Sequence, residues 1–136
     1  MPRRKSEIGL DKSTPSLICL GGNAESLEII KQVSVLGYRP IIISRGYGLP
    51  AERWAKSFPK VKRGMDRIDN ALFWRGDCYN PRLAVSCIAQ NSHYPNATDY
   101  DGGNFDRESI VGVLCCAVDA PQAQAAVAEK YHLPTI

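Results

Sequence analysis

The stretch from residue 17 to residue 44 constrains the fold more than any other part of the sequence. It begins with a short apolar run, 17–20, that ends in a glycine-rich turn. Residues 24–36 then carry apolar side chains at helical spacing, with polar side chains opposite, up to Gly37. Three consecutive isoleucines within 40–44 predict a second buried strand. A strand, a glycine turn, a helix and a strand in this order indicate a right-handed parallel βαβ unit.

The same alternation continues along the chain. Residues 49–58 predict a short helix with Pro50 in its first turn, and residues 72–74 fit either a third strand or part of a short helix. We therefore predict an α/β domain: a three-layer, doubly wound parallel sheet of the Rossmann-like type. Its elements include strands at 17–20, 40–44 and 111–117 and helices near 24–36, 80–90 and 121–131.

The length of 136 residues fits a single domain with one core. Residues 1–15 are polar and charged and predict a flexible N-terminal tail, which leaves 16–136 as the folded domain. Residues 91–106 contain Asn, Asp, Gly and Pro throughout, without periodicity. We expect them to form a surface loop that is a candidate for disorder.

Composition and charge argue against several classes of partner. The net charge of +3 is too small to indicate nucleic-acid binding, and acidic residues interrupt the basic cluster at 53–67. No apolar run approaches the about 18 residues of a membrane span, and the basic N-terminus lacks the apolar core of a signal peptide. We therefore expect a cytoplasmic protein without a membrane partner. The five cysteines form no C-x-x-C motif, which argues against a metal site or a disulfide framework.

Ligands of doubly wound folds bind beyond the carboxyl ends of the strands, where the strand order reverses. If the first strand is central, this crevice lies between its glycine turn and residues 118–120. The N–H groups of Gly21, Gly22 and Asn23 could hold an anion there, or the glycines only allow a tight turn. Asp119 could contact a substrate, although its place at the start of a helix also suits an N-terminal cap.

A second motif, Ser44-Arg45-Gly46-Tyr47-Gly48, follows the second predicted strand. Ser44 and Arg45 are candidate substrate- or anion-binding residues, and the alternative is a flexible turn. Residues 46–51 also fit the dinucleotide pattern G-x-G-x-x-A, but they follow the second strand rather than the first, which favours a plain turn. The letters SRGYG resemble the lipid A 4′-kinase family. That kinase chemistry needs a Gly-Lys phosphate loop, and the sequence has no Gly-Lys pair.

Two longer segments resemble one other family. They read LICLGGNAESLEIIKQVSVLGYRPIIIS and VGVLCCAVDAPQAQAAVAEKYHLP, and together they cover 52 of the 136 residues. The first is similar to the opening of the N-terminal preATP-grasp domain in ATP-grasp ligases of the carboxylase, carbamoyl-phosphate-synthase and amino-acid-ligase branches. The second resembles the strand, acidic turn and helix that close that domain.

The resemblance implies the N-terminal, substrate-side domain of a carboxylate–amine ligase that works through an acyl phosphate. It implies ATP and magnesium in the full-length enzyme, held by ATP-binding domains beyond Ile136, and no cofactor, catalytic residue or metal ligand in this chain. The implied partners are those domains and a small-molecule substrate. An exposed strand start at 133–136 would allow a homodimer. The alternative from another class is a stand-alone Rossmann-like module that binds a nucleotide or a protein.

Overall fold

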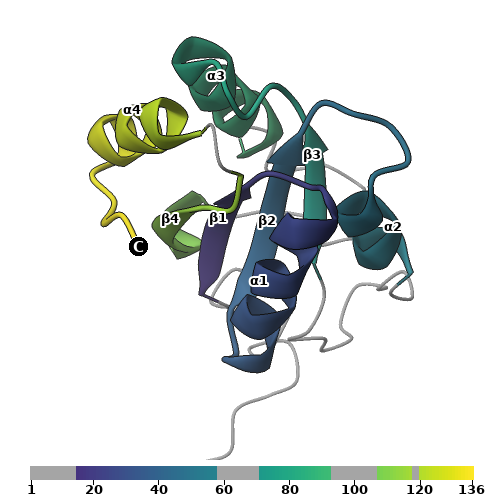
Figure 1. The fold of residues 1–136 in the computed structure, drawn as a ribbon. Coiled ribbons are helices and arrows are strands. Elements are labelled where there is room, and N and C mark those ends of the chain that lie inside the picture. Colours follow the sequence, from purple (N-terminus) through teal and green to yellow (C-terminus); the bar gives the residue numbers. More distant parts are fainter. Residues whose placement is uncertain (1–14, 58–70, 93–106, 118–119) are drawn as a thin grey trace, which may run out of the picture.

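The computed structural model describes residues 15–57, 71–92, 107–117 and 120–136. Within these ranges four parallel strands form one sheet, in the order β3-β2-β1-β4 (Figure 1). The strands are β1 (Ser16–Leu20), β2 (Arg39–Ser44), β3 (Leu72–Arg75) and β4 (Ile110–Cys115). The sequence left residues 72–74 open between strand and helix, and they form β3.

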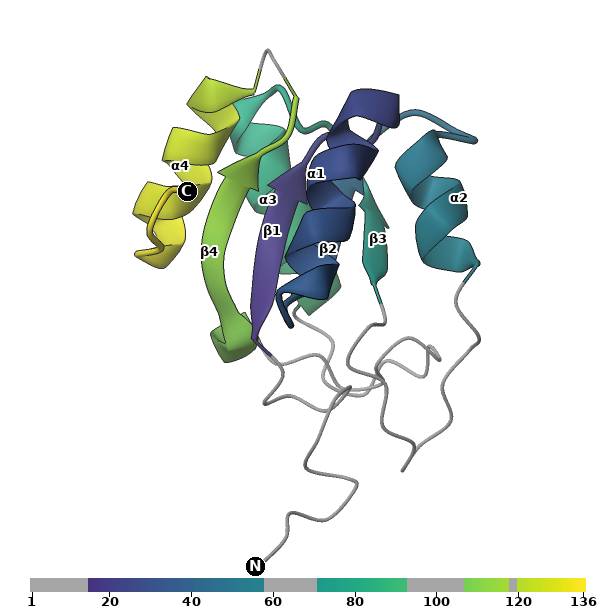
Figure 2. The same cartoon turned by 60° about the horizontal axis from the view of Figure 1, so that its bottom comes forward.

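Helices cover both faces of the sheet, so the domain has three layers. Figure 2 shows α1 in front of the sheet and α3 behind it. Helices α1 and α2 pack against each other on one side, and α3 packs against α4 on the other. The elements are α1 (Ala24–Val35), α2 (Pro50–Lys56), α3 (Pro81–Ser92), the short 3-10 helix η2 (Arg107–Ser109) and α4 (Pro121–Tyr131). The predicted doubly wound α/β fold is confirmed.

The apolar strands supply a core on each face of the sheet. Ile18 and Ile41 point to the face covered by α3 and α4, whereas Cys19 and Ile42 point to the face covered by α1 and α2. All four side chains are inaccessible to water. This double burial explains why the two strands read as continuous apolar runs rather than alternating ones.

Strand β1 is central, with β2 on one side and β4 on the other. Leu20 is paired with Ile43 and also with Cys115, so the turns that follow these three strands leave the sheet at the same edge. Ser44 is paired with Arg75 at the end of β3. The order of the strands reverses between β1 and β4, as the prediction of the ligand crevice requires. Asp119 lies outside the described residues.

The chain after α4 returns to the sheet beside β4. The N–H group of Val113 donates to the carbonyl of Pro134, and the N–H group of Ile136 donates to the carbonyl of Val113, each at 3.1 Å. Thr135 forms a parallel bridge with Val113. The expected strand start within 133–136 therefore exists as a parallel pairing. None of the helices in the described ranges has the length and apolar character of a membrane span.

Candidate functional site

Both glycines after β1 pack closely against residues at or just after the ends of the neighbouring strands. Gly21 has φ of +128°, and a Cβ atom there would lie 2.8 Å from the Cβ of Ala117 and 2.8 Å from Oγ of Ser26. A Cβ atom on Gly22 would lie 3.1 Å from the Cβ of Ser44. Of the two interpretations of this turn, the structure supports the packing role, because the glycines let β1 approach the ends of both neighbouring strands.

Asn23 is the N-terminal cap of α1. Its Oδ1 accepts a hydrogen bond of 2.8 Å from the N–H group of Ser26. The Ser26 hydroxyl in turn donates to the carbonyl of Cys116 at 2.8 Å. This bond crosses the place where the strand order reverses, next to the contact between Gly21 and Ala117. The base of the predicted crevice between β1 and β4 is therefore filled by protein atoms.

The end of β2 and the turn after it carry two further predicted site residues, Ser44 and Arg45. Ser44 is 9% exposed and packs beside Gly22, whereas the side chain of Arg45 is 72% exposed. The Nη1 atom of Arg45 lies 3.5 Å from Oδ2 of Asp77, which follows β3. The other oxygen of Asp77 accepts from the backbone N–H groups of Tyr79 at 2.8 Å and Asn80 at 3.3 Å. Asp77 is thus fixed by its own turn, while Arg45 has one long ion pair.

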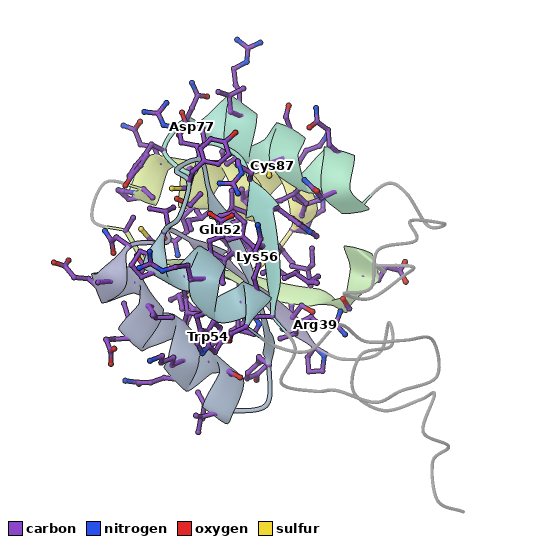
Figure 3. All side chains as sticks on the ribbon, turned by 90° about the vertical axis from the view of Figure 1, so that its right-hand side faces the viewer. Arg39, Glu52, Trp54, Lys56, Asp77 and Cys87 are labelled. Atoms are coloured by element: carbon purple, nitrogen blue, oxygen red, sulfur yellow. The ribbon has the colours of Figure 1, made fainter. Side chains whose placement is uncertain are left out.

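A network around Glu52 holds this turn in place, and the sequence analysis missed it. The Glu52 carboxylate, 7% exposed, accepts from both terminal nitrogens of Arg75, from Nζ of Lys56 at 2.8 Å and from the N–H group of Gly48 at 3.0 Å. Arg75 also donates to the carbonyl of Gly46. Figure 3 shows Glu52 and Lys56 beside each other on α2. Glu52 and Lys56 stand four residues apart on a predicted helix, which was an available signal.

The network has a clear electrostatic effect. Hydrogen bonds from Arg75 and then from Lys56 lower the pKa of Glu52 from 4.5 to about 2. The hydrogen bond to Glu52 raises the pKa of Arg75. Both groups are therefore charged at neutral pH. The positive charges of Arg75 and Lys56 balance the negative charge of the Glu52 carboxylate.

Tyr47 stands between the two anchored glycines of this turn. Its ring centroid lies 4.0 Å from Cζ of Arg75, and the side chain as a whole is 82% exposed. One face of the ring therefore rests on a guanidinium group that Glu52 already holds. The arrangement presents a fixed aromatic side chain to solvent.

The thiols and acids of the described residues are not grouped as a metal site would require. Among these residues, no group of three His, Cys, Asp or Glu side chains is placed to hold a metal ion. The five cysteines are unpaired as thiols. Cys115 and Cys116 contact opposite faces of the sheet, as their alternation in the sequence predicted. Burial raises the pKa of the thiols of Cys78 and Cys87 to about 11 in each case.

The structure thus brings Gly22 and Ser44 together and places Arg45 beside Asp77 at the carboxyl edge of the sheet. Gly21 and Asn23 have structural partners at the same edge. No protein-family model, curated protein or solved structure matches this chain.

Proposed function

We propose that this chain is the N-terminal, substrate-side domain of an ATP-grasp ligase. Such an enzyme activates a carboxylic acid with ATP as an acyl phosphate and passes the acyl group to an amine or a similar nucleophile. In this proposal the domain helps to hold the acid at the carboxyl edge of the sheet. The chemistry itself would take place on ATP-binding domains beyond Ile136.

The observation that carries the proposal is the spatial relation of the two segments that resemble the family. They are separated in sequence by more than half of the domain, yet β1 in the first segment pairs in parallel with β4 in the second. The family resemblance therefore falls on one contiguous half of the fold, around the reversal of strand order. A chance likeness of two unrelated segments would not be expected to converge there.

The two carboxylates near the turn after β2, those of Glu52 and Asp77, do not fit a magnesium site. Glu52 is bound by two cations, and Asp77 by Arg45 and two backbone N–H groups. Magnesium prefers oxygen ligands with open positions, and neither carboxylate offers one. This agrees with a division of labour in which magnesium and the phosphates that transfer are held by other domains. We expect Arg45 to contact the substrate acid, since its guanidinium is exposed at this edge.

The first test is the gene. A reading frame that continues past Ile136 for about 200 residues, with a glycine-rich loop and spaced lysines, would support the ligase. A stop codon directly after Ile136 would contradict it and would favour the stand-alone binding module.

The second test uses the full-length enzyme. With ATP, magnesium, hydroxylamine and a panel of carboxylic acids, a ligase forms a hydroxamate with its own acid, because hydroxylamine traps the acyl phosphate. We expect Arg45→Gln to raise the KM for that acid by about tenfold and to leave the KM for ATP unchanged. Lys130→Gln, which removes an exposed cation in the last turn of α4, serves as the control. An equal rise in both KM values for Arg45→Gln would contradict the assigned role.

A further inference from the structure

The turn at residues 45–47 combines two properties that seldom occur together at a surface. Its side chains are exposed, at 72% for the side chain of Arg45 and 82% for Tyr47. Its backbone is nevertheless held on both sides of Tyr47, by Arg75 at the carbonyl of Gly46 and by Glu52 at the N–H group of Gly48. Because the backbone is already held, ligand binding has to order only the exposed side chains and not the turn itself.

The two arginines at this edge differ in what they can still bind. Arg75 donates to Glu52 and to the Gly46 carbonyl, and its face rests against the ring of Tyr47. Within the described ranges, Arg45 makes one ion pair, of 3.5 Å with Asp77, and its side chain is mostly exposed to water. Such exposed pairs contribute little free energy, so an incoming anion can replace the carboxylate of Asp77 at small cost.

Tyr47 offers a surface for a flat ring. One face of its phenol ring lies over Arg75, and the high exposure leaves the rest of the ring open to solvent. Arg45 stands two residues away on the same held turn. A planar ring stacked on Tyr47 would thus carry any attached acidic group close to a guanidinium.

We propose that residues 45–47 form a subsite for a small anion that carries a planar ring. The ring stacks on Tyr47, and a phosphate or carboxylate of the same molecule pairs with Arg45. Two kinds of metabolite share this chemistry, namely nucleotides and aromatic carboxylic acids. The subsite uses the same Arg45 that the ligase proposal assigns to the substrate acid. It needs no ATP-binding domain and no acyl transfer, so its test does not depend on that proposal.

Asp77 sets the strength of the subsite, because its carboxylate competes with the ligand for Arg45 and repels the anion. Asp77→Asn removes that charge. The amide oxygen of asparagine can still accept from the N–H groups of Tyr79 and Asn80, so the turn before α3 is retained. This substitution therefore tests the effect of the Asp77 charge without disturbing the turn. The proposal predicts that the affinity for the anion rises.

The experiment is a titration of the whole chain with small-molecule probes. Calorimetry and ligand-observed NMR measure the binding. The probes are adenosine 5′-monophosphate and indole-3-acetate, each compared with a matched anion that has no planar aromatic ring, ribose 5-phosphate and acetate respectively. We expect weak, saturable binding of at least one ring-bearing probe, with the dissociation constant rising as salt is added. Saturation transfer should be strongest at the protons of the planar ring.

Three variants assign the contacts. Tyr47→Leu should lower the affinity for the aromatic probe by about tenfold, which is the size expected for one stacked ring. The affinity for the matched non-aromatic anion should not change. Arg45→Gln should lower the affinity for the aromatic probe and for its matched anion by about fivefold each. The loss of one exposed ion pair has an effect of this size. Asp77→Asn should raise the affinity for both anions by a few fold. Lys130→Gln is the control for a change of net charge, and circular dichroism checks that each variant is folded.

Binding of the nucleotide alone or of the indole acid alone would identify which source supplies the ligand. The proposal is overturned if neither ring-bearing probe binds at millimolar concentration. It is also overturned if folded Tyr47→Leu protein keeps the preference for ring-bearing probes, or if Asp77→Asn weakens binding. The gene test of the ligase proposal is unaffected by any of these results.

Discussion

The hydroxyl group of Ser26 donates a 2.8 Å hydrogen bond to the carbonyl oxygen of Cys116, which lies 90 residues further along the chain. Ser26 is in the first turn of α1, and Cys116 directly follows β4. Both residues are buried. The bond therefore ties the first helix to the last strand of the described sheet at the place where the strand order reverses.

Ser26→Ala should lower the free energy of unfolding by about 1–2 kcal/mol, because it removes a buried hydrogen bond and leaves the Cys116 carbonyl without this donor. Ser86→Ala is the matched control, since Ser86 is exposed on α3 and its replacement should change stability by less than about 0.5 kcal/mol. Urea denaturation measures both. Equal effects of the two substitutions would show that the bond contributes nothing specific.

Gly21→Ala should destabilise the domain by about 3 kcal/mol or more, because a Cβ atom meets Ala117 and Ser26 at 2.8 Å and the backbone conformation is strained. Gly37→Ala separates these two causes. Gly37 also has a positive φ, +96°, but open space around it, so only strain of about 1–2 kcal/mol is expected. A comparison of the two unfolding curves isolates the cost of the close contact. If Gly37→Ala were as harmful as Gly21→Ala, packing would not be the reason for Gly21.

Glu52→Gln should lower the free energy of unfolding by about 1–2 kcal/mol at neutral pH, since it weakens the hydrogen bonds from Arg75, Lys56 and Gly48. The estimate is modest because the side chains of Lys56 and Arg75 are 65% and 27% exposed, so water replaces part of the interaction. Glu28→Gln, on the exposed side of α1, is the control at the same pH and should have almost no effect.

The difference in stability between the natural protein and Glu52→Gln should also depend on pH. The pKa of Glu52 falls from 4.5 in the unfolded chain to about 2 in the fold, so the unfolded chain binds the proton first as the pH falls. The contribution of this carboxylate is complete above about pH 5 and decreases progressively as the pH falls through about 2, below which both states are protonated. Thermal unfolding at a series of pH values measures it. A difference that stays constant down to pH 3 would contradict the assigned pKa.

The thiols of Cys78 and Cys87 should resist alkylation in the folded protein. Burial raises the pKa of each to about 11, so little thiolate exists at pH 8. We expect iodoacetamide to modify them about a hundredfold more slowly than in urea, as followed by mass spectrometry of the peptides. The comparison with the half-buried Cys115 in the same sample controls for the reagent. Rapid labelling of Cys87 without urea would mean that α3 opens readily from the sheet.

Most of the fold could be predicted from local patterns. The run of isoleucines in β2 is buried on both faces, and this burial is what a run of consecutive apolar residues indicates. Gly37 ends α1 with a positive φ, and the Asn80 side chain accepts from the N–H groups of Arg82 and Leu83 at the start of α3. β3 could not be assigned from the sequence. Its four residues do alternate between buried and half-buried positions, but they are too few to show a period.

The candidate site could be predicted only in part. The edge of the sheet was predicted from the glycine turn on the condition that the first strand is central, and Arg45 does lie at that edge beside Asp77. The contacts of Glu52 with Arg75 could not be predicted, because they join α2 to the end of an unassigned strand. The filled base of the crevice depends on how closely Gly21 approaches Ala117, which no local pattern reports.

The anchors of the 45–47 turn have a consequence for how this surface can evolve. Arg75 and Glu52 bind the turn through a main-chain carbonyl and a main-chain N–H group, which every residue type except proline would supply. Mutation at positions 45 and 47 therefore changes the groups displayed to solvent without removing the bonds that hold them. Related sequences can keep Glu52, Arg75 and the two glycines while the two displayed positions diverge, and the recognised molecule would then change before the scaffold does.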